Sequence, residues 1–150
     1  MGVILCSSCL IGVNARYNCT NSKINNIVDI FKGHILYAIC PEQLGGLPTP
    51  RPRIEVCNGL AVDKDWNNYS DQLLKGADEV LNLAKALGIK VALMNDGTTS
   101  CGIKQRPDGK FNGNLVYGSG YTPHILQRNG IKVFSQYELP IILKYLNYIN

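Results

Sequence analysis

Four short apolar runs of strand length recur along the chain, and segments with helical periodicity lie between them. The runs cover residues 1–6, 34–39, 89–94 and 131–134 and are rich in Val, Ile and Leu. Strands that are apolar along their whole length are typical of a parallel sheet that helices cover on both faces. Because strand and helix patterns alternate, the chain predicts an α/β fold.

The helical segments are predicted from their apolar faces and capping residues. One helix is expected from Asn21 or Ser22 to Gly33, and the longest from Asn68 or Ser70 to Gly88. The predicted buried residues are Ile24, Ile27, Val28 and Phe31 in the first helix, and Leu73, Ala77, Val80, Leu81, Ala84 and Leu87 in the second. Residues 135–138 match a capping box, residues 123–128 a short helix, and residues 106–109 the tip of a small hairpin.

Between residues 40 and 58, closely spaced prolines predict an irregular loop without a helix. The length of 150 residues suits one domain with a hydrophobic core. We therefore expect a single-domain three-layer sandwich over residues 1–150, Rossmann-like, with a mostly parallel sheet.

Three of the six cysteines each follow a predicted strand: Cys9, Cys40 and Cys101. The carboxyl ends of parallel strands meet at one edge of a sheet, where ligands of such folds bind. Three thiolates at that edge can hold a metal cluster and leave one metal position free for chemistry. With no obvious fourth ligand, three soft sulfurs suit an iron–sulfur cluster better than zinc.

Other arrangements of the cysteines stay open at this point. Cys6 and Cys9 form a C-x-x-C pair, which suggests thiol redox chemistry, although the residues that follow are a poor helix start. A zinc site would need Cys6 to turn out of its strand and join Cys9, Cys40 and Cys101. Cys6, Cys19 and Cys57 are otherwise expected to be structural or incidental.

Two polar residues lie next to these cysteines. Glu42, two residues after Cys40, is placed to act as a general base, or instead to pair with Arg51 or Arg53. Ser100 precedes Cys101 and is placed to donate a hydrogen bond to a cluster sulfur or to a substrate.

The net charge of +4 comes from scattered Lys and Arg residues, which permits an anionic substrate or RNA but argues for neither. We find no leader peptide and no apolar run near the roughly 20 residues that span a bilayer. We expect no membrane partner and a cytoplasmic location, where cysteines more often serve metal or redox chemistry than disulfides.

Three motifs together resemble the TudS-type thiouracil desulfidase family, and the resemblance covers nearly the whole chain. The first motif is residues 8–12 with Arg16 and Tyr17; the second is residues 40–47 with residues 50–52 and Glu55; the third is residues 100–102, followed by residues 108–109 and 118–120.

The resemblance implies a 4Fe–4S cluster held by Cys9, Cys40 and Cys101, with one open iron site for a thiocarbonyl sulfur. It implies a hydrolytic reaction in which Glu42 helps to deprotonate water, and in which Ser100 orients the substrate or shuttles a proton. Sulfide leaves and no external electrons are needed. Arg16, Tyr17, Arg51 and Thr98 are the expected substrate-binding residues.

The expected substrate is a free thiolated base or a related small thio-compound. Relatives that resemble tRNA desulfidases carry an extra C-terminal domain, so tRNA is the less expected partner. The alternatives are a metal- or cluster-binding protein that handles sulfur without hydrolysis, and a C-x-x-C redox protein.

The chain departs from the family pattern around the expected pocket. Thr98 and Thr99 replace a serine and a proline, Asn18 and Cys19 replace Asp-Gly, and a lysine expected near residues 94–95 is absent. These changes concern the substrate pocket more than the cluster ligands.

Overall fold

A parallel four-stranded sheet forms the centre of the computed structural model, which describes residues 2–149. The strands run in the order β2-β1-β5-β8, and every neighbouring pair is parallel. Their bounds are β1 (Val3–Ser7), β2 (Ile35–Ile39), β5 (Val91–Met94) and β8 (Lys132–Ser135). Met1, which begins the first predicted strand, lies outside the described residues.

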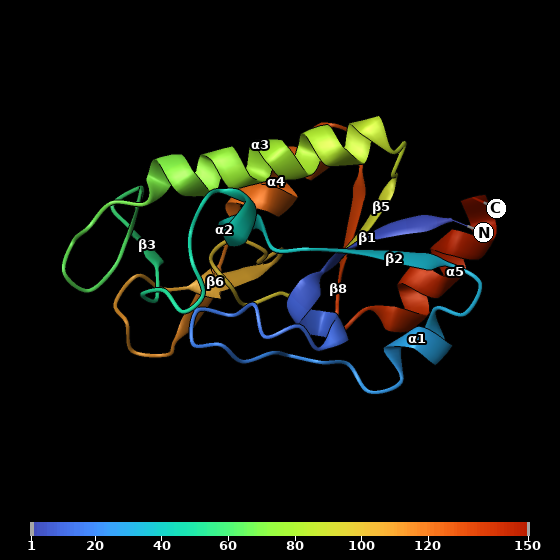
Figure 1. Ribbon diagram of the computed structural model, residues 1–150, viewed down its shortest axis with the longest axis horizontal. Helices are drawn as coiled ribbons and strands as arrows, with labels where there is room; N and C mark the ends of the chain where they lie inside the picture. The colour runs from blue at the N-terminus through green and yellow to red at the C-terminus, as the bar shows by residue number, and fades with distance from the viewer. Residues whose placement is uncertain (1, 150) are drawn as a thin grey trace.

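Helices cover both faces of this sheet (Figure 1). On one face lie α2 (Pro41–Leu44), α3 (Ser70–Ala86) and α4 (Tyr121–Arg128), and on the other lie α1 (Ile27–Ile30) and α5 (Leu139–Ile149). The arrangement confirms the predicted three-layer, single-domain α/β fold with a mostly parallel sheet.

Each strand contributes side chains to two hydrophobic cores, one on each face of the sheet, because successive side chains point to opposite faces. In β1, Leu5 packs against α3 and α4 residues, whereas Ile4 and Cys6 pack against α1 and α5 residues. All three are fully buried, and burying a side chain the size of leucine contributes about 1.5–3 kcal/mol. This double coverage explains why the strands are apolar on both faces.

The longest predicted helix is confirmed as α3, with Leu73, Ala77, Val80, Leu81 and Ala84 buried. Leu87 lies just past its end and is 48% exposed, so its place in the stripe was wrong. In the predicted capping box, the Ser135 N–H donates to Glu138 Oε1 at 3.0 Å, and α5 begins one residue later.

The first predicted helix is mostly wrong. Only α1 is helical, and the segment before it runs beside the 3-10 helix η1 (Ser8–Ile11). The Ser22 N–H donates to the Cys9 carbonyl at 3.0 Å, and the Ile24 N–H to the Leu10 carbonyl at 2.9 Å. Val28 is 74% exposed and does not belong to the buried face.

Residues 40–58 are also more regular than predicted, because they contain α2 and strand β3 (Glu55–Cys57). Pro41 occupies the first position of α2, where a helix needs no N–H donor. The α2 and α3 backbones touch: a Cβ on Gly45 would collide with the Gln72 carbonyl, and one on Gly76 with the Pro41 carbonyl. This contact fixes the segment that follows β2.

Two hairpins complete the fold beside the carboxyl end of the sheet (Figure 1). One pairs β3 (Glu55–Cys57) with β4 (Leu60–Val62), and the other pairs β6 (Gln105–Pro107) with β7 (Leu115–Tyr117). The second confirms the predicted hairpin, but its tip lies at residues 108–114 and not at 106–109, because residues 106 and 107 belong to β6. None of the helices within residues 2–149 combines the length and apolar character needed to cross a bilayer.

The order of the strands reverses between β1 and β5, because β2 lies on one side of β1 whereas β5 and β8 lie on the other. The chain passes from β1 to β2 through α1 on one face, and from β2 to β5 through α3 on the other. In doubly wound sheets, ligands bind in the crevice outside the strand ends at such a point. The site is therefore expected beyond the carboxyl ends of β1 and β5.

Candidate metal centre and pocket

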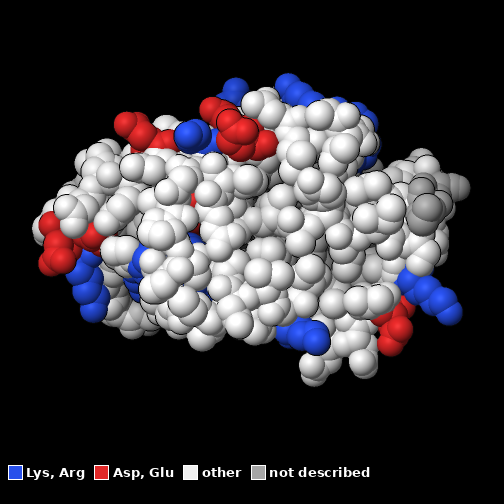
Figure 2. All heavy atoms as spheres, in the orientation of Figure 1, with Lys and Arg blue, Asp and Glu red and all other residues white. Residues whose placement is uncertain are grey.

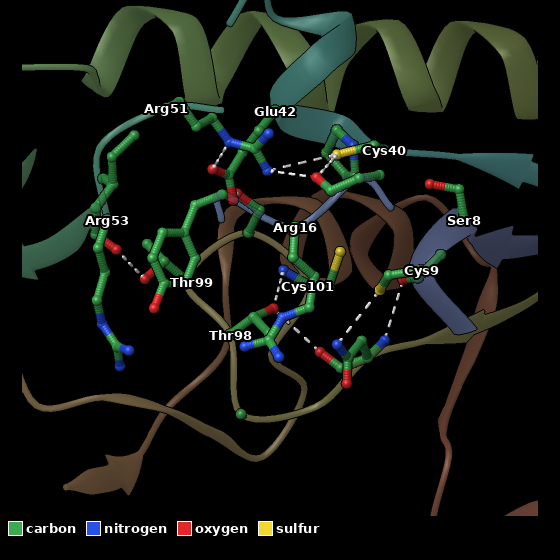
Figure 3. Close-up of a pocket in the computed structure, with 18 of the residues that line it drawn as sticks. Ser8, Cys9, Arg16, Cys40, Glu42, Arg51, Arg53, Thr98, Thr99 and Cys101 are labelled. Carbon is green, nitrogen blue, oxygen red and sulfur yellow. Dashed lines mark hydrogen bonds and ion pairs between the residues drawn. The ribbon is translucent and has the colours of Figure 1, made fainter. Parts of the chain in front are cut away.

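A cavity of about 100 Å³ opens at this point, and the three strand-end cysteines line it. Cys9 lies in η1 directly after β1, Cys40 directly follows β2, and Cys101 lies in the loop after β5. Figure 3 shows their sulfur atoms facing a common space. The structure thus brings together the three cysteines that were predicted to meet because each follows a strand.

Burial disfavours the ionised thiolate form of these three cysteines as long as no positive group binds them. Burial raises the pKa of Cys9 and Cys40, and raises that of Cys101 well above its ordinary value. The neighbouring thiols add to the rise for Cys9 and Cys101, since like charges repel. Bound metal reverses this balance, because a coordinating thiol is held as the thiolate.

Each of the three sulfurs also has a hydrogen-bond donor beside it. Asn95 Nδ2 donates to Cys9 Sγ at 3.4 Å, and Arg51 Nη2 approaches Cys40 Sγ at 3.9 Å. The Ser7 hydroxyl, which donates to Met94 Sδ at 3.7 Å, stands beside Cys101, and its proximity opposes the rise that burial causes in the pKa of Cys101. Donors of this kind stabilise ligating sulfurs in metal sites.

One further hydroxyl lines the cavity without a partner. Ser8 Oγ is buried and makes no hydrogen bond to any part of the chain that the structure describes. Buried hydroxyls are nearly always paired, so Ser8 is free to bond a group in the cavity. Three soft ligands, a donor for each, and this free hydroxyl fit a sulfur-rich metal cluster.

Cys6 does not take part in this arrangement. Its side chain is fully buried in the core beneath α1 and α5, and burial raises its pKa to about 12. A buried thiol of that kind is a poor nucleophile, so the geometry argues against the C-x-x-C redox reading. Cys6 is structural, as expected.

The single-zinc reading is not supported either. Within residues 2–149, no three His, Cys, Asp or Glu side chains are placed to hold one metal ion. This result does not exclude a metal cluster, because the ligands of a cluster bind different metal atoms and need not surround a single ion. Cys19 is exposed and Cys57 is half-buried in β3; both lie outside the cavity lining.

Glu42 is held in the pocket by hydrogen bonds to both of its carboxylate oxygens. Its Oε1 accepts from Arg51 Nε at 2.8 Å, and its Oε2 accepts from Ser100 Oγ at 2.7 Å. The ion pair anticipated for Glu42 therefore forms with Arg51, whereas Arg53 pairs with Glu55 at 2.9 Å. The ion pair with Arg51 uses one carboxylate oxygen and leaves the other in contact with Ser100. The two hypotheses for Glu42, an ion-pair partner and a general base, are therefore compatible.

Arg51 is fixed from several sides, its side chain being only 4% exposed. Beyond Glu42, its guanidinium donates to the Ala15 carbonyl at 2.9 Å and to Thr49 Oγ1 at 2.9 Å. With most of its donors used, Arg51 orients the Glu42 carboxylate more than it offers contacts to a ligand.

The remaining predicted substrate residues, Arg16, Tyr17 and Thr98, all line the pocket. Figure 3 shows the Arg16 guanidinium reaching toward Thr98, and within residues 2–149 it forms no ion pair. The Thr98 hydroxyl donates to the Asn95 carbonyl and accepts from the Cys101 N–H, each at 3.1 Å. Thr98 therefore shapes the Cys101 loop, whereas Arg16 is available to a ligand.

Several pocket residues were not found from the sequence. Arg53 stands beside the Tyr17 ring, 5.7 Å from its centroid, and also lines the cavity. Asn95, which contacts Cys9, was not predicted as a site residue. Its position directly after a buried strand was a usable signal, since the cysteines were selected by the same rule.

Comparisons with known proteins agree with this geometry. A family model described as 2-thiouracil desulfurase matches residues 4–138, which include all three pocket cysteines. The uncharacterized protein YbbK of Bacillus subtilis (strain 168) is 32% identical over 154 residues, covering 94% of this chain and 100% of the relative. A solved structure of the 4Fe–4S-dependent thiouracil desulfidase TudS is similar with a TM-score of 0.92, at 35% identity over 99% of both chains.

Proposed function

The chain belongs to the 2-thiouracil desulfurase family, and we propose that it hydrolyses the C=S bond of a thiolated nucleobase or related small thio-compound, releasing sulfide. The observation that carries the proposal is the Glu42–Ser100 pair beside three converging cysteines. A base and a hydroxyl next to a soft-metal site are groups that can together serve the hydrolysis of a thiocarbonyl.

Cys9, Cys40 and Cys101 are the residues that would hold a 4Fe–4S cluster, with one iron left open to the substrate. When bound, the cluster would supply a soft Lewis acid, whose chemistry suits the polarisation of a thiocarbonyl group. The reducing cytoplasm is the compartment that suits such thiol ligands.

Glu42 then acts as the general base. A water molecule loses a proton to the Glu42 carboxylate, and its oxygen forms a bond to the thiocarbonyl carbon. The C–S bond breaks, sulfur leaves as sulfide, and a carbonyl remains, so no electrons are gained or lost overall. The ion pair with Arg51 holds the carboxylate in one orientation for this step.

Ser100 and Arg16 serve the substrate in this proposal. The Ser100 hydroxyl, bonded to Glu42, passes a proton between the carboxylate and the departing sulfur or the ring. Arg16 donates to an acceptor on the base, and Tyr17 and Thr98 form the walls of the pocket. Arg51 acts through Glu42.

An anaerobic assay with reconstituted protein tests the proposal. The loaded protein is incubated with 2-thiouracil, and uracil and sulfide are measured in the absence of reductant. Glu42→Gln should keep the cluster colour and lose about 10²–10⁴ in turnover, whereas Cys101→Ser should lose the colour. Glu79→Gln, on the exposed side of α3, is the matched control and should behave as the unaltered protein.

Full turnover by Glu42→Gln would contradict the role of Glu42. A coloured, unaltered protein that never releases sulfide from any thio-base would instead support a sulfur-handling protein without hydrolytic activity.

A further inference from the structure

Asn95 joins the end of β5 to the Cys9 ligand. It directly follows β5 and is 6% exposed. Its backbone N–H donates to Ser7 Oγ at 3.1 Å, and its side-chain Nδ2 donates to Cys9 Sγ and to Ser22 Oγ, each at 3.4 Å. The side chain is thus held between the end of β1 and the segment that precedes α1.

The direction of the Asn95 amide is fixed by its neighbours. The Asp96 backbone N–H, which can only donate, bonds Gln136 Oε1 at 2.8 Å. The other end of Gln136 must therefore be its NH₂, which donates to Asn95 Oδ1 at 3.1 Å. The Asn95 NH₂ is then the group that faces the Cys9 sulfur.

We propose, resting on the cluster of the proposed function, that Asn95 is a positioning residue that donates a fixed N–H···S hydrogen bond to the Cys9 ligand. Gln136 keeps the Asn95 amide from turning its oxygen toward the sulfur. We call this pair of hydrogen bonds, from Gln136 to Asn95 and from Asn95 to Cys9, the relay. Hydrogen bonds to ligating sulfurs draw off negative charge and so make a cluster easier to reduce. They also hold the ligand in place.

The relay predicts a change in the cluster itself, separate from any change in turnover. Asn95→Leu keeps the side-chain size and removes the donor, so the midpoint reduction potential of the loaded protein should become more negative. Cluster loss to a chelator should be about 10-fold faster, the scale on which outer-shell partners act. Gln136→Leu frees the amide to rotate and should shift both properties in the same direction, by less.

The measurement is an anaerobic redox titration followed by electron paramagnetic resonance, together with bleaching of the cluster absorbance in chelator. Asn147→Leu on α5 and Gln127→Leu on α4 change exposed residues of the same types and serve as controls. Gln136 lies nearer the surface than Asn95, so Gln136→Leu decides the question if Asn95→Leu does not fold.

A loaded Gln136→Leu protein with unaltered potential and unaltered chelator resistance would overturn the relay while leaving the desulfidase proposal intact. If the unaltered protein takes up no cluster, the proposed function fails first, and the relay fails with it. The cluster content of the unaltered protein separates these two outcomes.

Discussion

Ser100 Oγ donates a 2.7 Å hydrogen bond to Glu42 Oε2, although the two residues lie 58 positions apart in the chain. Glu42 stands on α2 after β2, and Ser100 stands in the loop after β5. The bond therefore places a hydroxyl and a carboxylate in the lining of the cavity that Cys40 and Cys101 also line. Figure 2 shows how few charged side chains lie over the middle of the face viewed, where uncharged surface predominates.

Removing the Ser100 hydroxyl should slow turnover without emptying the metal site. Ser100→Ala removes the hydroxyl that is proposed to transfer a proton, a role worth roughly 10²–10⁴ in rate, so kcat is expected to fall about 100-fold or more. The cluster absorbance should be unchanged. Unchanged kcat in a fully loaded Ser100→Ala protein would show that the hydroxyl takes no part in proton transfer.

The Glu42–Arg51 pair should matter for stability as well as orientation. Arg51→Met leaves the Glu42 carboxylate without its cation in a largely buried place, which should cost about 3 kcal/mol in the free energy of unfolding. Arg53→Met is the matched comparison, since the Arg53 side chain is 37% exposed. Glu55 keeps N–H donors from Gly109 and Phe111, so about 1 kcal/mol is expected there.

Urea unfolding of the two metal-free variants measures this difference. Equal losses for Arg51→Met and Arg53→Met would contradict the view that burial makes the first pair the more important one.

Ser8 should have opposite effects in the metal-free and the loaded protein. Because Ser8 Oγ has no partner in the described chain, Ser8→Ala removes an unsatisfied group. The metal-free protein should then be equally stable, or more stable by up to about 1 kcal/mol. The loaded protein should lose its cluster faster in chelator.

Ser7→Ala is the contrast, because Ser7 Oγ accepts the Asn95 N–H at 3.1 Å. It should cost the metal-free protein about 1 kcal/mol. A destabilised metal-free Ser8→Ala protein would mean that the hydroxyl already has a partner.

Asp63 should make stability fall in acid, independently of the pocket. Hydrogen bonds from Asn67 and Tyr69 hold the pKa of Asp63 below its ordinary value. A carboxyl whose folded pKa is lowered stabilises the fold above its unfolded pKa, which is about 3.9. That contribution is lost as the pH falls through the unfolded and then the folded pKa.

Asp63→Asn should therefore narrow the gap in unfolding free energy between pH 6 and pH 3. Thermal unfolding of the metal-free protein at both values measures it. A variant with the same acid sensitivity as the unaltered protein would remove Asp63 as a cause.

The sequence predicted those parts of the fold that depend on periodicity. The four strands of the parallel sheet and α3 were predicted because their apolar patterns are long enough to show a period. The family resemblance, which came from the three cysteine motifs, is also confirmed. The helix expected from residue 21 or 22 did not form because η1 carbonyls capture the Ser22 and Ile24 N–H groups. Such pairing between segments leaves no periodic trace.

The candidate site shows the same division. Strand ends were enough to bring Cys9, Cys40 and Cys101 together, because parallel strands finish at one edge. The bond between Asn95 and Gln136 joins residues 41 positions apart and depends on side-chain direction. No local pattern contains that information, and α2, at four residues, is too short to show a helical period.

The most direct test of the central claim is turnover of 2-thiouracil by the loaded protein in ¹⁸O-labelled water without any reductant. Uracil incubated with the same protein serves as the control for exchange. Hydrolysis predicts one ¹⁸O atom in each uracil formed and one sulfide released per uracil. Uracil without the label, or sulfide release that starts only when an electron donor is added, would contradict a hydrolytic desulfidase.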